Sequence, residues 1–175
     1  KDIDLKNIKK RNKFSIIYRN KNYLENITNL LKFRRICRIK SIKFYVANDT
    51  KLAVLLNSDG IYISAFNKSF KALSLKRSNF ALIGSAHNFK EISLKTRQGC
   101  KTILLSKLFL VNYNKKAPFL GVVKFNNHLK IYKNLIPLGG ISISNLNNLN
   151  NINCRGLALL SEIKKKPANI INRLF

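Results

Sequence analysis

Short apolar runs alternate along the chain with segments whose apolar residues recur every three or four positions. Runs of the first kind are typical of buried β-strands, whereas the second spacing predicts amphipathic helices. The apolar runs predict strands over residues 14–18, 42–47, 60–63, 80–84, 102–105, 135–138 and 156–160. The helical spacing, together with helix-starting polar residues, predicts helices over residues 23–36, from 50, over 69–75, 88–97 and 121–130, after 144 and from 161.

The alternation of strands and helices predicts a parallel sheet, because strands that are apolar throughout are buried on both faces. The pattern gives seven strands, whereas a closed (β/α)8 barrel has eight. We therefore predict an α/β fold, a (β/α)8 TIM barrel that lacks its first strand in this chain, with residues 1–175 as one domain. The complete absence of Met agrees with a fragment or a trimmed chain. An open doubly wound sheet is the alternative, but no Gly-x-Gly-x-x-Gly follows the first strand.

Two local signals define the helix predicted over residues 88–97. Asn88 is followed three residues later by Glu91, which is the spacing of a capping box, in which each side chain accepts a hydrogen bond from the other residue's N–H. Gly99 stands where a helix commonly ends in a glycine.

Two glycines, Gly139 and Gly140, follow the strand predicted over residues 135–138. Paired glycines let the backbone turn sharply and bring N–H groups close to an anion. The next apolar run, residues 156–160, ends at Ser161. Two neighbouring strands that end in such donors predict one phosphate-sized site built from two loops, and the alternative is a simple turn at the glycines.

The charge balance is strongly basic, with 34 Lys and Arg against seven Asp and Glu and a net charge of +27. Lys, Asn and Ile are abundant throughout, which favours a compositional bias over a dedicated basic patch. The positive field still attracts phosphorylated substrates, and it attracts nucleic acid non-specifically at low salt. The 11 Phe residues mostly stand in apolar runs, so they are expected in the core rather than on a base-stacking surface.

The three cysteines, Cys37, Cys100 and Cys154, are far apart and form no Cys-x-x-Cys pair, so we expect buried thiols in a reducing compartment. His87 and His128 are too few and too widely spaced for a histidine metal centre. The apolar runs fall well short of the roughly 18 residues that span a bilayer. These features predict a cytoplasmic protein with no membrane contact and no signal peptide.

Residues at the predicted strand ends are polar, and in a (β/α)8 barrel these carboxyl ends build the active site. The set comprises Arg19, Lys21, Asn48, Asp49, Asn67, Ser85, His87, Lys107, Lys115, Gly139, Gly140 and Ser161. It suits a substrate that carries phosphate or pyrophosphate, bound by cations and backbone donors. Asp49 is the one carboxylate of the set, so no carboxylate pair serves acid–base catalysis. Asp59 precedes a strand, where a turn or cap role is expected, and His87 suits a capping or packing role as well as an acid–base one.

Six segments of the chain, taken in order, resemble motifs of the thiamine-phosphate synthase/TenI family. They are Tyr18-Arg19-Asn20-Lys21, Asn48-Asp49 with Ser58-Asp59-Gly60-Ile61-Tyr62, Gly84-Ser85-Ala86-His87, Lys115-Lys116-Ala117-Pro118-Phe119-Leu120-Gly121, Leu138-Gly139-Gly140-Ile141 and Gly156-Leu157-Ala158-Leu159-Leu160-Ser161. The resemblance covers nearly the whole chain. It implies a (β/α)8 barrel, in agreement with the alternation of strands and helices.

The resemblance also implies an activity. Synthases of this family join a hydroxymethylpyrimidine pyrophosphate to a thiazole phosphate, with Mg²⁺ and release of pyrophosphate, so a transferase of thiamine biosynthesis is expected. The resemblance assigns Arg19, Lys21 and Asn48 to the pyrophosphate and pyrimidine, Asp49 to Mg²⁺, Ser85 and Lys115 to the reacting region and the leaving pyrophosphate, and Gly139, Gly140, the N–H of Leu160 and Ser161 to the thiazole phosphate.

Three positions depart from the family pattern: Ile17 stands where a Gln is expected, Lys107 aligns with the catalytic His of the TenI branch, and position 67 lacks an acidic metal ligand. Synthases usually carry a second Mg²⁺ carboxylate after the strand that corresponds to residues 60–63. Here Ser64-Ala65-Phe66-Asn67 offers at best the neutral amide of Asn67. Hard cations favour carboxylate oxygens, so a weakened Mg²⁺ site is expected.

Two other hypotheses stay open. One is a TenI-type isomerase of the thiazole phosphate, or a related phosphate-ligand enzyme that does not use Mg²⁺. The other is a non-catalytic module whose basic surface binds nucleic acid or another polyanion, although no sequence-specific nucleic-acid partner is expected. The expected partners are the phosphorylated pyrimidine and thiazole, and a homo-oligomer is left open.

Overall fold

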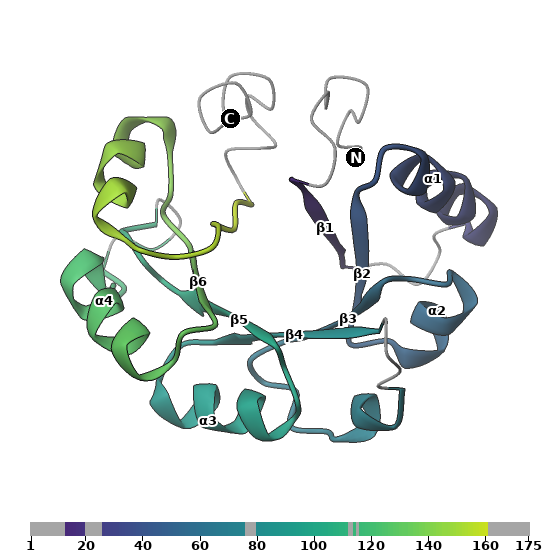
Figure 1. Cartoon of the computed structure of the whole chain (residues 1–175), viewed down its shortest axis with the longest axis horizontal. Coiled ribbons are helices and arrows are strands. Elements are labelled where there is room, and N and C mark those ends of the chain that lie inside the picture. Colours follow the sequence, from purple (N-terminus) through teal and green to yellow (C-terminus); the bar gives the residue numbers. More distant parts are fainter. Residues whose placement is uncertain (1–12, 20–25, 76–79, 112–113, 115, 161–175) are drawn as a thin grey trace. The chain divides into compact units, whose positions relative to one another are not determined.

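The computed structural model describes residues 13–19, 26–75, 80–111, 114 and 116–160. Within these residues helices alternate with strands, as Figure 1 shows. The elements are β1 (Ser15–Tyr18), α1 (Ile27–Ile39), β2 (Lys43–Ala47), α2 (Thr50–Leu55), β3 (Gly60–Ile63), the 3-10 helix η2 (Lys71–Leu75), β4 (Ala81–Ala86), α3 (Phe89–Arg97), β5 (Thr102–Ser106), α4 (Gly121–Ile131), β6 (Leu135–Leu138) and the 3-10 helix η3 (Ile143–Asn151). No helix in this described part of the chain has both the length and the apolar character needed to cross a bilayer.

The chain divides into two compact units. The first holds the described residues up to 84 together with 94–101, and the second holds residues 85–93 together with the described residues from 102 onward. The first unit therefore contains β1 to β3 and most of β4, and the second contains β5, β6, α4 and η3. The single domain predicted over residues 1–175 stays a prediction.

Within each unit the strands follow one another in chain order, β1 to β4 in the first and β5 next to β6 in the second. In the first unit β1 pairs with β2, β2 with β3 and β3 with β4, all in parallel, and Gly60 of β3 lies opposite both Tyr45 and Ala81. In the second unit β5 pairs in parallel with β6, with Ile103 opposite Leu135. Parallel strands joined by helices make this an α/β fold of the TIM-like (β/α)n kind.

The prediction of a seventh strand over residues 156–160 is wrong. Leu138 and Ala158 form one isolated parallel bridge, and the Ala158 N–H donates to the Pro137 carbonyl at 2.9 Å. The segment begins with exposed Gly156, which has no side chain to pack and therefore weakens a strand. The described residues thus hold six strands rather than seven, and they do not make a full eight-stranded barrel.

Two predicted helices are 3-10 helices instead of α-helices, namely η2 in the 69–75 segment and η3 in the segment after 144. The segment η3 is rich in Asn and η2 contains Ser74; such side chains bond to nearby backbone and compete with regular helix bonds. In η2, for example, the Ser74 hydroxyl donates to the Lys71 carbonyl at 2.8 Å. The strand predicted over 80–84 extends to Ala86.

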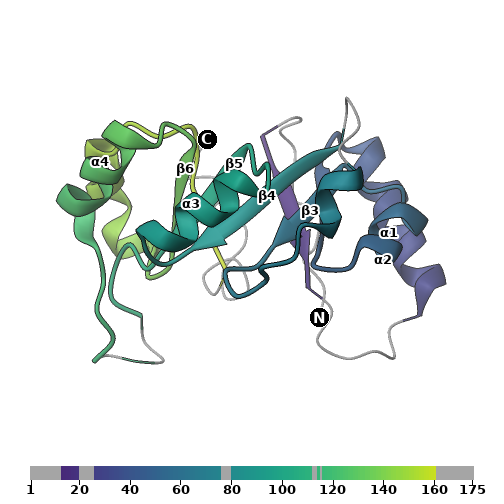
Figure 2. The ribbon, with the colours of Figure 1, turned by 90° about the horizontal axis from the view of Figure 1, so that it is seen from below.

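The core of each unit combines buried strands with one face of the helices. In the first unit all four residues of β3 are buried, which explains why this strand is apolar throughout. Helices α1 and α2 lie side by side in Figures 1 and 2, and both pack on β2. In the second unit Ile103 and Leu105 of β5, Leu135 of β6 and Phe125 of α4 are almost completely buried.

The prediction that Phe residues lie in the core is only half right. Phe44 and Phe125 are fully buried. Four others are exposed to solvent: Phe66, Phe70, Phe89 and Phe119. They stand in loops or at the first turn of a helix, where an apolar neighbour in sequence does not bring burial in space.

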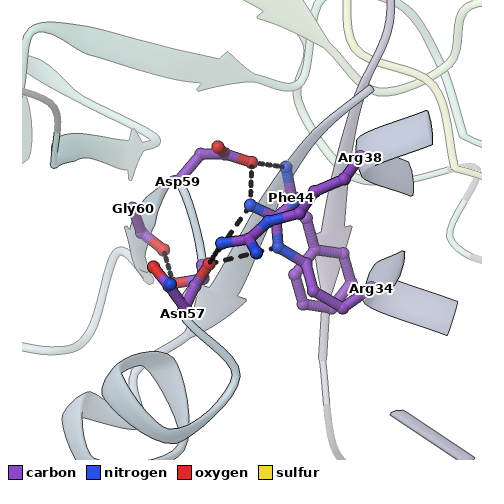
Figure 3. A network of polar contacts seen from close by, with 7 residues as sticks. Arg34, Arg38, Phe44, Asn57, Asp59 and Gly60 are labelled. Atoms are coloured by element: carbon purple, nitrogen blue, oxygen red, sulfur yellow. Dashed lines mark hydrogen bonds and ion pairs between the residues drawn. The ribbon is translucent and has the colours of Figure 1, made fainter. Parts of the chain in front are cut away.

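A polar network joins α1 and β2 to the loop before β3 (Figure 3). Arg34 of α1 is 5% exposed, and its Nη2 lies 3.0 Å from Oδ2 of Asp59. The same Asp59 oxygen accepts the Phe44 N–H at 2.7 Å, and Arg34 Nε and Nη2 donate to the Asn57 carbonyl at 3.2 and 3.1 Å. The expected turn or cap role of Asp59 is therefore combined with an ion pair to a buried cation.

Asp59→Ala should lower the free energy of unfolding by about 2 kcal/mol, because it leaves the buried guanidinium without its counter-ion. This is below the usual range for a broken buried pair, since the Asp59 side chain is 35% exposed and solvent screens it. Urea denaturation measures the loss. Arg38→Met is the matched control, because it removes an exposed hydrogen bond to the same Asn57 carbonyl, at 3.3 Å, and should cost no more than about 0.5 kcal/mol. Equal losses in the two variants would contradict the role given to Asp59.

Gly60 is required where β3 lies between its two neighbours. A Cβ at this position would stand 1.9 Å from the Ala81 carbonyl oxygen and 2.9 Å from Cε1 of Tyr45. The first of these is backbone, so it cannot move aside as a flexible side chain can.

Gly60→Ala is expected to destabilise the protein by about 3 kcal/mol or more, because the new methyl group separates paired strands. At Gly156 a Cβ would have nothing within 4 Å, so Gly156→Ala is the matched control and should change stability by no more than about 0.5 kcal/mol. Thermal unfolding of both variants makes the comparison. A Gly60→Ala protein as stable as its control would show that the strand spacing is wrong.

Candidate functional site

Arg19 directly follows β1, and its guanidinium carbon lies 5.6 Å from the centre of the Tyr62 ring of β3. A cation over an aromatic face at this distance is attracted by the electrons of the ring. Tyr62 is buried, whereas Arg19 is exposed. The ring therefore holds a cation at the strand end while leaving it accessible to an anionic ligand.

Asn48 directly follows β2 and has a φ of 59°, in the left-handed region that Asn tolerates better than most residues. Its N–H donates to the Tyr62 carbonyl at 2.8 Å. Its side-chain Oδ1 accepts three hydrogen bonds, from the Ser64 N–H at 3.0 Å, the Ser64 hydroxyl at 3.1 Å and Nδ2 of Asn67 at 3.0 Å. Because the oxygen is used within the protein, the amide NH₂ is what Asn48 can offer to a ligand.

Asp49 is the N-cap of α2. Its Oδ1 accepts the Leu52 N–H at 2.9 Å, which satisfies one of the free donors in the first turn of the helix. The residue is exposed, so Oδ2 is the oxygen left to face solvent or a ligand. The predicted strand-end residues Arg19, Asn48, Asp49 and Asn67 thus all lie at the carboxyl ends of β1 to β3 or in the loops that follow them.

Both ends of the Asn67 amide are bonded inside the first unit. Nδ2 donates to Oδ1 of Asn48 at 3.0 Å, and Oδ1 accepts the Ser69 N–H at 2.9 Å. The side chain therefore links the loop after β3 to the end of β2.

Two side chains that the sequence pattern does not single out hold this loop, Lys95 of α3 and Gln98, which are 0% and 1% exposed. Lys95 Nζ donates to the Asn67 carbonyl at 2.6 Å and to Oε1 of Gln98 at 2.9 Å. Gln98 Nε2 donates to the carbonyls of Asn67 and Ser69, at 3.0 and 2.8 Å. A Lys on an amphipathic helix is normally solvated, so its place in the sequence carried no signal of this role.

A small cavity of about 70 Å³ lies beside Asn48 and Asn67. It is also lined by Thr50, Ile61, Ile63, Ser69, Lys71 and Ala72. Sites for small organic molecules usually measure roughly 300 Å³ or more. The cavity is therefore too small for an organic substrate, which would instead contact the exposed groups at the strand ends.

The residues of the first unit do not fit a magnesium site with two carboxylates. Asp49 offers one carboxylate. The side-chain oxygen of Asn67 accepts the Ser69 N–H, and its NH₂ donates to Asn48. Mg²⁺ takes oxygen ligands in near-octahedral geometry, and an NH₂ group cannot serve. Within the described ranges, no three His, Cys, Asp or Glu side chains gather as a metal centre does. The metal roles predicted for Asp49 and Asn67 stay predictions.

In the second unit, Ser85 of β4 is 5% exposed and His87 is exposed just after the strand. Glu91 holds His87 in place, because its Oε2 accepts the His87 N–H at 2.7 Å and lies 3.0 Å from the ring Nδ1.

The predicted capping box is therefore only half formed. Asn88 Oδ1 accepts the Glu91 N–H at 2.9 Å, as predicted. The Glu91 carboxylate turns to His87 rather than to the Asn88 N–H, because His87 presents two polar groups to it. The helix end is as predicted, with Gly99 at a φ of 78°.

Burial raises the pKa of Glu91, but the hydrogen bonds from the His87 N–H and ring, the His87 charge and the hydrogen bond with Asn88 outweigh it and hold the pKa below its usual value. A carboxyl group whose pKa is lower in the folded than in the unfolded protein stabilises the fold at pH values above its unfolded-state pKa. That stability is lost as the pH falls through the folded-state pKa. Glu91→Gln should therefore cost about 0.5–1 kcal/mol at pH 7, the size of a lost cap, and less at pH 3. Thermal unfolding between pH 7 and 3 tests this, and a loss that does not change with pH would contradict it.

Gly139 and Gly140 both have left-handed φ values, of 91° and 72°. A Cβ on Gly140 would stand 2.4 Å from the Phe109 carbonyl oxygen, so the turn also packs tightly on neighbouring backbone. The Phe109 N–H donates to the Gly139 carbonyl at 3.0 Å, and Asn145 Nδ2 donates to the Gly140 carbonyl at 2.8 Å. The predicted sharp turn is confirmed, while its anion-binding role stays a prediction.

Leu160 follows Ala158 by two residues, and Ala158 forms an isolated parallel bridge with Leu138, two residues before Gly140. The prediction that two loops meet there stays a prediction. Three other predicted site residues, Lys21, Lys115 and Ser161, lie outside the described residues, and their roles stay predictions.

The cysteines are free thiols. Cys37 and Cys100 are buried as predicted, whereas Cys154 is only half-buried. Burial raises the pKa of both Cys37 and Cys100 to about 11, so their thiols stay protonated at neutral pH and are not nucleophiles.

A family model described as thiamine monophosphate synthase, TMP-TENI, matches residues 6–163. The chain belongs to this family. Among its relatives, the thiamine-phosphate synthase of Flavobacterium psychrophilum is 24% identical over 151 residues, covering 81% of this chain and 73% of the relative. The synthase of Geobacillus thermodenitrificans is 22% identical over 78% of this chain, and that of Methanococcus maripaludis is 24% identical over 75%. The chain spans 63% and 64% of these last two relatives.

Solved structures with the same fold include thiamine phosphate pyrophosphorylase from Pyrococcus furiosus. It superposes with a TM-score of 0.70 at 15% identity, covering 92% of this chain and 84% of that one. The citrate synthase SbnG has a TM-score of 0.53 at 10% identity, over 90% of this chain and 81% of its own. These likenesses confirm the TIM-like fold of the family member and carry nothing about its substrate.

Proposed function

We propose that this member of the thiamine monophosphate synthase family couples hydroxymethylpyrimidine pyrophosphate to a thiazole phosphate and releases pyrophosphate. The family match over residues 6–163 carries the proposal. The exposed Arg19 and the free amide NH₂ of Asn48 support it, because both are donors suited to a pyrophosphate.

In this reaction the bond between the pyrimidine methylene carbon and the pyrophosphate oxygen breaks, and its electron pair leaves with pyrophosphate. The thiazole nitrogen gives its lone pair to the same carbon, which forms the new C–N bond. Negative charge grows on the leaving group, so cations and N–H donors lower the barrier more than a strong base does. A site without a carboxylate pair suits this chemistry.

The site residues divide between the two substrates. We assign Arg19, Lys21 and Asn48 to the pyrophosphate and pyrimidine, Ser85 and Lys115 to the reacting region and the leaving group, and Gly139, Gly140, the Leu160 N–H and Ser161 to the thiazole phosphate. Backbone N–H groups at a glycine turn suit a phosphate because they approach it without a side chain in the way.

Incubation of the protein with both substrates and MgCl₂ should yield thiamine phosphate, detected by chromatography. Arg19→Gln is expected to raise the KM for the pyrimidine pyrophosphate by about tenfold or more, the value of a hydrogen bond to a charged group. Arg35→Gln, which neutralises an exposed Arg on α1, is the matched control and should leave the KM unchanged. The proposal fails if wild-type protein forms no thiamine phosphate. Isomerisation of the thiazole phosphate in its place would support a TenI-type enzyme.

A further inference from the structure

We propose that Asn67 is a positioning residue, and not a metal ligand, which holds the Asn48 amide so that its NH₂ faces an acceptor atom of the pyrophosphate substrate. The identity of that substrate rests on the function proposed above. The direction of the Asn48–Asn67 hydrogen bond does not rest on that function, because the surrounding backbone fixes it.

The Ser64 N–H fixes the orientation of the Asn48 amide. This backbone N–H can only donate, and it lies 3.0 Å from one side-chain atom of Asn48, which must therefore be the oxygen Oδ1. The Ser69 N–H fixes the Asn67 amide in the same way. It lies 2.9 Å from one side-chain atom of Asn67, which must therefore be Oδ1. With both oxygens assigned, the group of Asn67 that meets Asn48 is its NH₂, and the contact is a hydrogen bond in one direction.

A carboxylate at position 67 cannot make this contact. Its second oxygen would stand about 3.0 Å from Oδ1 of Asn48, with no proton between them. Asn48 cannot turn its amide over in response, because its NH₂ would then face the Ser64 N–H. The carboxylate found at this position in the family pattern and the Asn48 network of this chain therefore exclude each other.

The backbone that carries Asn67 is itself held. Lys95 and Gln98 are fully buried and donate to the carbonyls of Asn67 and Ser69 at distances from 2.6 to 3.0 Å. A loop fixed through these carbonyls keeps the Asn67 side chain directed at Asn48. Moving the side chain toward a cation would break its hydrogen bonds to Oδ1 of Asn48 and to the Ser69 N–H.

The first experiment separates positioning from metal binding and needs no activity. Asn67→Asp, Asn67→Ala and wild-type protein are compared by thermal unfolding at neutral pH, with and without MgCl₂. We expect Asn67→Asp to melt below Asn67→Ala, because repulsion is added to the lost hydrogen bond, and MgCl₂ to leave this order unchanged. Asn127→Asp makes the same change on the exposed face of α4, and its melting temperature should equal that of wild type. A melting temperature of Asn67→Asp that MgCl₂ raises above that of wild type would overturn the proposal.

The second experiment tests whether Asn67 acts through Asn48. Binding of inorganic pyrophosphate is measured by calorimetry for wild type, Asn48→Ala, Asn67→Ala and the double variant. Loss of the oriented donor should weaken binding by about three- to tenfold in each single variant, and Asn67→Ala should add nothing once Asn48 is Ala. Additive effects of the two substitutions, or unchanged affinity in Asn67→Ala, would overturn it.

The two proposals fail separately. If wild-type protein forms no thiamine phosphate but the variants couple in pyrophosphate binding, the synthase assignment falls and the role of Asn67 stands. If thiamine phosphate is formed and Asn67→Asp binds Mg²⁺ more tightly than wild type, the synthase assignment stands and the role of Asn67 falls.

Discussion

The Asp59 carboxylate accepts the Phe44 N–H and pairs with Arg34, and the packing of the first unit depends on this one group. It joins a helix, a strand and the start of the next strand at the amino end of the sheet. The buried guanidinium makes the contact necessary, because a charge removed from water needs a counter-ion. The chain has only seven acidic residues, so few groups could take the place of Asp59.

Charge is arranged differently at the carboxyl ends of the same strands. There Arg19 is left exposed over Tyr62, and the neighbouring polar groups are mostly amides and hydroxyls. The amino end therefore uses its carboxylate for stability, whereas the carboxyl end keeps donors available for an anion. This division agrees with TIM-like folds in general, where loops at the carboxyl ends of the strands carry function.

The sequence predicts what depends on local pattern. The β3 strand was located to the residue because all four of its side chains are buried, and the Gly139–Gly140 turn because only glycine suits its φ values. Contacts between distant segments were not predictable from pattern. Nothing in the spacing around Lys95 shows that its ammonium group meets the Asn67 carbonyl 28 residues away. The strand prediction over residues 156–160 is wrong, because apolar composition does not reveal whether a neighbouring strand is in reach.

The family resemblance located Asn48, Asp49 and Asn67, but it could not show how their side chains bond. The direction of the Asn48–Asn67 hydrogen bond follows from two backbone N–H groups, those of Ser64 and Ser69, which no motif includes. Position 67 therefore illustrates that a motif gives the place of a residue while its neighbours decide its chemistry.

The Asn48–Asn67 link has one more consequence. Amide groups neither gain nor lose a proton in the range where proteins stay folded, so the direction of each hydrogen bond is the same in acid and in alkali. A carboxylate in the same place would change from acceptor to donor as it took up a proton. In this chain the orientation of Asn48 is thus insensitive to acidity.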